Sequence, residues 1–165
     1  MARLLVVHHS PTRSMRTLLD SVLAGTEDEE ITGVEVVVRQ ALEATAEEVL
    51  GCDGYLLGTT ANFGYMSGAL KHFFDSTFLQ VGGSLSSTGA ADDSSGRTAG
   101  RPFGLYVHGR YDTAGAVRSV LSIVGALGWK QGYEVLEVMG DVDENDQEAA
   151  YTLGGTLAAL LTGDA

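Results

Sequence analysis

Apolar residues recur along this chain with two different spacings. Residues 4–7 form a continuous Leu-Leu-Val-Val run, which is typical of a strand buried on both faces. The next segment has apolar residues at i, i+3, i+4, i+7 and i+8, the spacing of one helix face: Met15, Leu18, Leu19, Val22 and Leu23. The same alternation continues to the end of the chain, and it predicts stacked βαβ units around a parallel sheet.

Five repeats of this pattern are predicted. The expected strands are residues 3–8, 34–39, 54–59, 103–107 and 133–138, and the expected helical segments are 15–23, 45–50, 66–77, 117–127 and 150–161. Thr45 and Glu48 have the spacing of a capping box, and Gly51 is placed to end that helix in a left-handed conformation. Gly128 is expected to stop the fourth helix.

The length of 165 residues fits one domain over 1–165. Residues 82–100 lose the periodic pattern and consist mostly of Gly, Ser, Thr, Ala and Asp around a single large apolar residue, Leu85. We expect a flexible loop there. Two interpretations are open, a lid or edge over a site and a solvated insertion.

Charge and composition exclude several functions. The formal charge of −12 repels nucleic acid and anionic lipid, so neither is an expected partner. No apolar run approaches the roughly 20 residues of a membrane span, and the first one is too short for a signal peptide, which predicts a cytoplasmic protein.

The lone Cys52 cannot form an internal disulfide and is expected to be a buried apolar residue. The four histidines show no metal-binding spacing, so no metal site is predicted.

The chemistry of such a sheet should lie at one edge. Right-handed crossovers bring the carboxyl ends of all parallel strands together, and ligands bind where the winding direction reverses. For five strands the common order is 2-1-3-4-5, which places this crevice at the loops after His8, Thr59 and Val107.

Each of these loops has unusual composition. The first carries hydroxyls at Ser10, Thr12 and Ser14 before a helix, and these either cradle a phosphate or only cap the helix. The second combines small residues with an amide and aromatic rings, which suits a planar heterocycle or merely anchors the loop. The third begins with His108, which is either a group beside an anionic ring edge or a strand-end histidine with its hydrogen bonds satisfied.

The second loop and the following helix resemble a known family. Gly58-Thr59, Phe63-Gly64 and Met66-Ser67-Gly68, followed by Leu70 and Phe74-Asp75, are similar to the pattern G-T-P-x-x-F-G-x-M-S-G. This pattern belongs to the NAD(P)H-dependent FMN reductase and quinone reductase branch of the flavodoxin-like superfamily, which includes the tryptophan-repressor-binding-protein-like quinone reductases. The resemblance spans nearly the whole chain. Two positions depart from the family: Arg13 stands where glycine is usual, and Thr60 replaces a proline.

The resemblance implies an α/β, flavodoxin-like, doubly wound five-stranded parallel sheet in the order 2-1-3-4-5, with noncovalent FMN. It implies hydride transfer from NAD(P)H through FMN to a quinone or flavin acceptor, without a catalytic side chain, and a possible homo-oligomer. By similarity, the phosphate would be surrounded by Ser10, Thr12, Arg13, Ser14 and Met15. The ring would be contacted by Ala61, Asn62, Phe63 and Gly64, with Thr60 beside them. The third side would be closed by His108, Gly109, Arg110, Tyr111 and Asp112.

Two alternatives to the reductase are open. One is a flavodoxin-type one-electron carrier, and the other is a flavin-free protein that binds a different nucleotide. The candidates for stacking on a flavin are Phe63, Tyr65, Tyr111 and Trp129.

Overall fold

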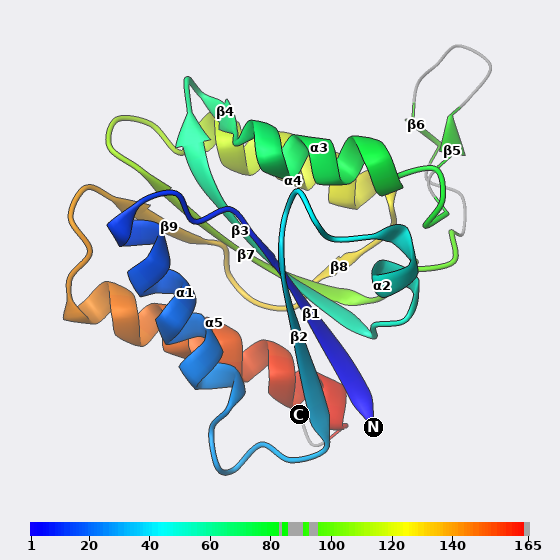
Figure 1. Ribbon diagram of the computed structural model, residues 1–165, viewed down its shortest axis with the longest axis horizontal. Helices are drawn as coiled ribbons and strands as arrows, with labels where there is room; N and C mark the ends of the chain where they lie inside the picture. The colour runs from blue at the N-terminus through cyan, green and yellow to red at the C-terminus, as the bar shows by residue number, and fades with distance from the viewer. Residues whose placement is uncertain (83, 86–90, 93–95, 164–165) are drawn as a thin grey trace.

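A twisted parallel sheet runs through the middle of the molecule (Figure 1). The computed structural model describes residues 1–82, 84–85, 91–92 and 96–163. The main strands are β1 (Ala2–His8), β2 (Val34–Gln40), β3 (Gly54–Asn62) and β7 (Pro102–Gly109), with two short strands, β8 (Lys130–Gln131) and β9 (Leu136–Met139), beyond β7. The spatial order is β2-β1-β3-β7 followed by β8 and β9. The predicted order 2-1-3-4-5 is therefore confirmed.

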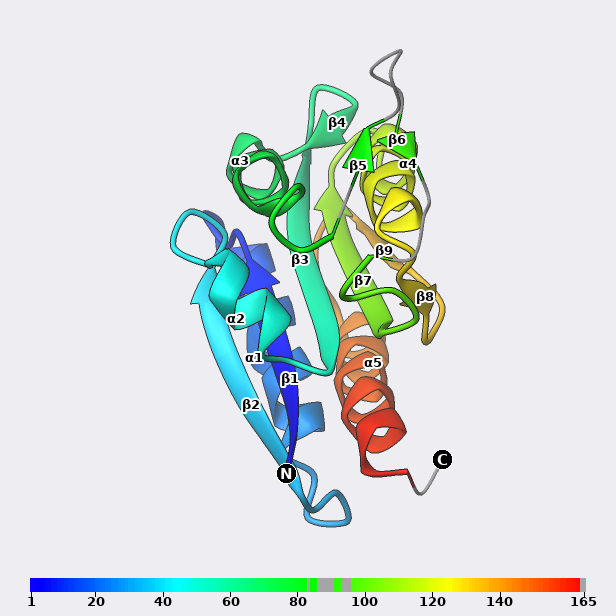
Figure 2. The same cartoon turned by 90° about the vertical axis from the view of Figure 1, so that its right-hand side faces the viewer.

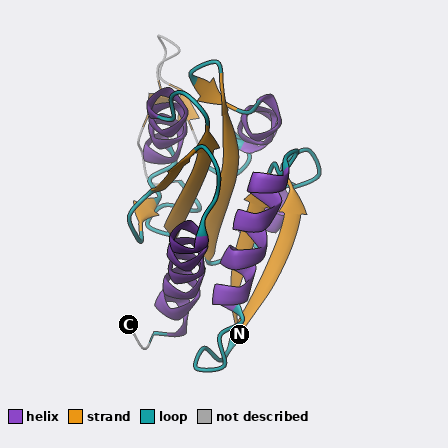
Figure 3. Ribbon diagram, turned by 90° about the vertical axis from the view of Figure 1, so that its left-hand side faces the viewer, coloured by secondary structure: helices purple, strands orange, loops and turns teal. Residues whose placement is uncertain are grey.

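Helices cover both faces of the sheet (Figures 2 and 3). α1 (Arg13–Thr26) and α5 (Glu144–Thr162) lie on one face, and α3 (Gly68–Thr77), α4 (Ala114–Ala126) and the short α2 (Ala46–Leu50) lie on the other. α1 and α5 touch backbone to backbone, since a Cβ on Gly154 would lie 2.0 Å from the carbonyl oxygen of Val22. Among the described residues, no helix has both the length and the apolar character needed to cross a membrane.

Strand β1 shows why the sheet needs two layers of helices. Its four central residues are fully buried and point alternately to the two faces. Leu5 and Val7 join the core under α2, α3 and α4, whereas Leu4 and Val6 join the core under α1 and α5. A continuous apolar run is stable only in a strand covered on both sides.

The helix ends agree with the sequence analysis in part. The capping box of Thr45 and Glu48 is formed at the start of α2. The expected left-handed cap at Gly51 is wrong, because Gly51 has φ −82° and the chain continues in a right-handed turn closed by the bond from Cys52 N to Val49 O. Gly128, with φ +73°, follows α4 as expected. Cys52 is buried, as predicted.

The fifth strand is not continuous, contrary to the expected strand over 133–138. Gln131 pairs with Phe103 and Leu136 pairs with Tyr106, so four residues (132–135) lie opposite two residues of β7 (104–105). This two-residue excess is a bulge that separates β8 from β9.

The segment 82–100 is only partly described. Ser84–Leu85 (β5) pairs antiparallel with Ala91–Asp92 (β6), so this part has some regular structure. The remainder of the expected flexible loop (residues 83, 86–90 and 93–95) lies outside the described residues. After it the chain is anchored by Thr98, which accepts a hydrogen bond from Trp129 Nε1 at 2.8 Å.

Candidate functional site

The second of the three predicted loops is a β-hairpin. Strand β3 continues past Thr59 to Asn62 and returns as β4 (Tyr65–Met66), with Asn62 opposite Tyr65. The two turn residues, Phe63 and Gly64, have φ of 51° and 74°, and a type I′ turn requires positive φ at both positions. The hairpin projects beyond the neighbouring strand ends at the upper left of Figure 1.

Helix α4 supports this hairpin from one side. A Cβ on Gly115 would lie 2.0 Å from the carbonyl oxygen of Gly64, so the first turn of α4 packs directly on the turn backbone. The hydroxyl of Ser119 also accepts a hydrogen bond from Met66 N at 3.3 Å. These contacts fix the position of Phe63, which is fully exposed.

A cleft of about 420 Å³ opens between the hairpin, the loop after β1 and the loop after β7. Eleven residues line it, and all of them are among the predicted cofactor-binding residues: Thr12, Thr60, Ala61, Asn62, Phe63, Gly64, His108, Gly109, Arg110, Tyr111 and Asp112. The carboxyl ends of β1, β3 and β7 therefore meet at one concave site, as the doubly wound topology predicts. Ser10, Arg13, Ser14 and Met15 do not line this cleft.

The loop after β1 ends at the first turn of α1. Thr12 is the N-cap, and its hydroxyl accepts from Met15 N at 3.2 Å. The first main-chain bond of the helix runs from Arg16 N to Thr12 O at 3.0 Å, so the N–H groups of Arg13 and Ser14 precede the helical ladder. The capping role and a binding role for this loop are thus compatible. The Met15 side chain is fully buried in the core, and only its main chain could belong to a site.

Ser10 is bonded to the last residue of β1. Its Oγ lies 2.8 Å from Nδ1 of His8, which is half-buried. Burial lowers the pKa of His8, the neighbouring His9 lowers it further, and Glu43 opposes them. The net lowering of its pKa favours the uncharged form of the His8 imidazole.

Thr60 holds a buried hydroxyl without a partner. Only 7% of the residue is exposed, and its Oγ1 makes no hydrogen bond among the described residues. The adjacent Thr59 is the opposite case, since its hydroxyl donates to Thr60 O at 2.8 Å and accepts from Ser67 N at 2.9 Å. Buried hydroxyls are normally paired, so Thr60 carries a polar group beside the cleft whose hydrogen-bonding capacity is unused among the described residues.

The third wall is held by hydrogen bonds to the end of β9. Nε2 of the buried His108 lies 2.6 Å from Gly140 O, and Gly140 N donates to Gly109 O at 2.8 Å. His108 thus has the structural role of a strand-end histidine, with Nδ1 as its remaining polar atom. Arg110 pairs with Asp141 at 3.1 Å on the surface, and Asp112 accepts from Ala114 N at 2.9 Å at the start of α4.

The four aromatic candidates separate into two groups. Phe63 and Tyr111 are exposed at the rim of the cleft, where a flat ligand could meet them. Tyr65 lies outside the cleft, in a groove beside Arg118 of α4. Trp129 is wrong as a candidate, because it is buried and stacked on Tyr55, with the two ring centroids 3.9 Å apart. It also lies just before β8, which pairs with the end of β7 opposite the cleft.

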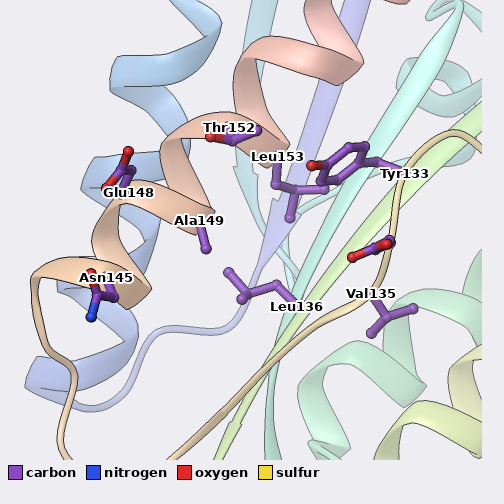
Figure 4. A pocket seen from close by; sticks show the side chains of 9 residues that line it. Tyr133, Val135, Leu136, Asn145, Glu148, Ala149, Thr152 and Leu153 are labelled. Carbon is purple, nitrogen blue, oxygen red and sulfur yellow. The ribbon is translucent and has the colours of Figure 1, made fainter.

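A second cavity, of about 340 Å³, was missed by the sequence analysis (Figure 4). It lies between residues 133–136, where the bulge leads into β9, and the first half of α5, and Figure 4 shows Tyr133 and Leu136 on one side with Ala149 and Thr152 on the other. No periodic signal predicts it, because the break between β8 and β9 beside it was not expected from the sequence.

Comparisons with known proteins agree with this architecture. No protein-family model matches the chain. A flavodoxin of Aquifex aeolicus (strain VF5) is 33% identical over 85 residues, which are 52% of this chain and 45% of that flavodoxin, so the match spans about half of each protein.

Solved structures match over the full length. A flavodoxin from the domain Archaea superimposes with a TM-score of 0.77 at 14% identity, over 97% of this chain and 99% of that one. A WrbA-like flavodoxin from Agrobacterium tumefaciens gives a TM-score of 0.72 at 15% identity, over 100% of both chains. This chain has the flavodoxin-like fold.

Proposed function

We propose that this chain is a redox protein that binds FMN noncovalently in the cleft at the carboxyl ends of β1, β3 and β7. The observation that carries the proposal is the Thr60 hydroxyl, which is buried beside the cleft and has no partner among the described residues. A buried hydroxyl left unpaired destabilises the chain, and a bound ligand with polar oxygens would remove that cost.

The cleft suits the parts of FMN. Its volume of about 420 Å³ lies within the usual range of small-molecule sites. The first turn of α1 offers main-chain N–H groups and the positive end of a helix dipole to the phosphate. Phe63 and Tyr111 are exposed on the hairpin and on the loop after β7, where they could cover a flat ring. The similarity to flavodoxins supports the same ligand.

Bound FMN would supply the redox chemistry, since flavins accept hydride or single electrons. The residues of this chain bind and orient it. Thr12 and the N–H groups of Arg13 and Ser14 hold the phosphate, and the hydroxyl of Thr60 donates to an oxygen of the ligand. The Asn62 amide, which can both donate and accept, pairs with the polar edge of the ring. Phe63 and Tyr111 exclude water from the ring faces.

For the reaction itself, we favour hydride transfer from NAD(P)H and electron delivery to a quinone or free flavin. The support is the Gly58 to Gly68 segment, which resembles the FMN-dependent quinone reductases. A one-electron carrier is the second candidate, and the match to the Aquifex aeolicus flavodoxin supports it.

Two titrations test the proposal in order. FMN and riboflavin are each added to the purified chain, and the quenching of flavin fluorescence is followed. FMN is expected to bind at least tenfold more tightly than riboflavin, since riboflavin lacks the phosphate; absence of FMN binding would overturn the assignment.

The loaded protein is then mixed anaerobically with NADH or NADPH and a quinone. Fast turnover identifies a reductase. Slow turnover, with reduction in two well-separated one-electron steps in a potentiometric titration, identifies a carrier.

A further inference from the structure

His8 and Ser10 form a hydrogen bond whose direction is chemically undetermined until the imidazole proton is placed. His8 Nδ1 and Ser10 Oγ lie 2.8 Å apart, at the point where β1 leaves the sheet for the phosphate-binding loop proposed above. A serine hydroxyl has one proton to donate, whereas a neutral imidazole nitrogen either donates or accepts. The two possible directions present different groups to a ligand.

If Nδ1 carries the proton, it donates to Ser10 Oγ, and the hydroxyl proton of Ser10 is free to point at an anion. If Nδ1 is bare, Ser10 donates its proton to His8 and presents lone pairs to the loop. A phosphate dianion is attracted by the first arrangement and repelled by the second. The imidazole thus decides whether Ser10 attracts or repels an anion.

We propose that His8 is a positioning residue that makes Ser10 a phosphate donor by placing a proton on Nδ1. This inference rests on the proposed function, because it assumes that FMN phosphate occupies the loop after β1. His8 touches no ligand atom in this account and acts only through Ser10.

The surroundings of His8 make this arrangement sensitive to pH. His9 disfavours a positive charge on His8, Glu43 favours it, and the paired residues on the adjacent strands, Gln40 and Gly58, carry no charge. Burial further lowers the pKa of His8 in the free chain. A nearby phosphate dianion raises that pKa, so by linkage phosphate-dependent affinity increases as the pH falls toward the pKa of the bound state. The phosphate takes up its own proton near pH 6, which acts in the opposite direction, so the effect of His8 must be isolated by substitution.

Two variants separate the contributions. His8→Asn places an amide near the position of Nδ1; the amide does not titrate, so its hydrogen bond to Ser10 is independent of pH. His8→Phe removes the hydrogen bond. His9→Asn is the matched control, since His9 is the adjacent histidine and its side chain makes no hydrogen bond among the residues described. The readout is the ratio of FMN to riboflavin affinity from pH 6 to 8, because riboflavin reports everything except the phosphate.

As the pH falls from 8 to 6.5, the ratio of FMN to riboflavin affinity should increase more in wild type than in His8→Asn. The expected difference between the two increases is about threefold to tenfold. His8→Phe removes the hydrogen bond to Ser10 together with the titrating group, so its ratio should lose the additional rise at low pH that wild type shows. His9→Asn should keep the wild-type dependence on pH, with a small upward shift of its midpoint. Nitrogen-15 NMR of the wild-type imidazole gives a measurement that needs no variant, and it should show Nδ1 protonated when FMN is bound.

Equal ratios in wild type, His8→Asn and His8→Phe, or a bare Nδ1 in the FMN complex, would overturn this inference while the proposed function stands. Failure of wild type to bind FMN would overturn both. The two failures are thus distinguishable.

Discussion

Replacing Thr60 by valine should stabilise the free protein and weaken the binding of FMN. Valine keeps the size and β-branching of threonine and replaces the hydroxyl by a methyl group. Because Oγ1 is buried and unpartnered in the described structure, the substitution removes a cost of about 1–3 kcal/mol. We expect a gain of about 1–2 kcal/mol, or roughly 2–8 °C in Tm for a chain of this length. Loss of a hydrogen bond to a neutral oxygen of the flavin ring costs about 0.5–1.5 kcal/mol, which weakens FMN binding roughly 2-fold to 13-fold.

Thr59→Val is the matched control for this prediction. It changes the same residue type one position earlier, but the Thr59 hydroxyl has two partners, Thr60 O and Ser67 N. Its loss should therefore destabilise the chain by about 1–3 kcal/mol. Urea denaturation followed by circular dichroism measures both stabilities, and flavin fluorescence measures the affinity of Thr60→Val. A Thr60→Val protein that is less stable than wild type, or that binds FMN equally well, would refute the reasoning.

Three further predictions concern other buried positions. Gly115→Ala should destabilise the chain by about 1–3 kcal/mol and weaken FMN binding, because its Cβ would overlap the backbone of Gly64. Gly125→Ala in the same helix should raise the Tm slightly, because its Cβ would meet no described atom within 4 Å. Equal Tm values for the two variants would contradict the packing described. Tyr106→Phe removes a fully buried hydroxyl that has no partner in the described part of the chain, and it should increase the free energy of unfolding in urea by about 1 kcal/mol. A decrease would show that the hydroxyl has a partner. Burial raises the pKa of Tyr55 to about 12, so the contribution of this phenol to stability is fully present below about pH 10 and is lost as the pH rises through about 12. Tyr55→Phe should therefore reduce the fall in the free energy of unfolding between pH 10 and 12. An unchanged dependence of that free energy on pH would refute the effect.

The sheet order and the position of the cleft could be predicted from the sequence. The alternation of strand-like and helix-like segments predicts a parallel sheet, right-handed crossovers bring its carboxyl ends to one edge, and the common order for five strands places the crevice there. The hairpin after β3 was expected as a loop instead, because Phe63 adopts a positive φ that non-glycine residues rarely adopt. Gly64, which tolerates the positive φ of the second turn position, was the available signal.

The remaining features depend on contacts between distant residues. Trp129 could not be excluded as a flavin contact until its stacking on Tyr55 was visible. The free hydroxyl of Thr60 is a property of its burial, and no local pattern distinguishes it from the fully bonded Thr59. The bulge after β8 likewise required the register against β7.

The divided fifth strand also affects how the protein behaves at high concentration. An uninterrupted border strand offers a template on which another chain can add, which is a common route to aggregation. Here the border beyond β7 consists of pieces of two and four residues, offset by the bulge. A strand of another molecule would therefore meet only short stretches of unpaired main-chain N–H and C=O groups along β8 and β9. Self-association by strand addition is disfavoured at this edge.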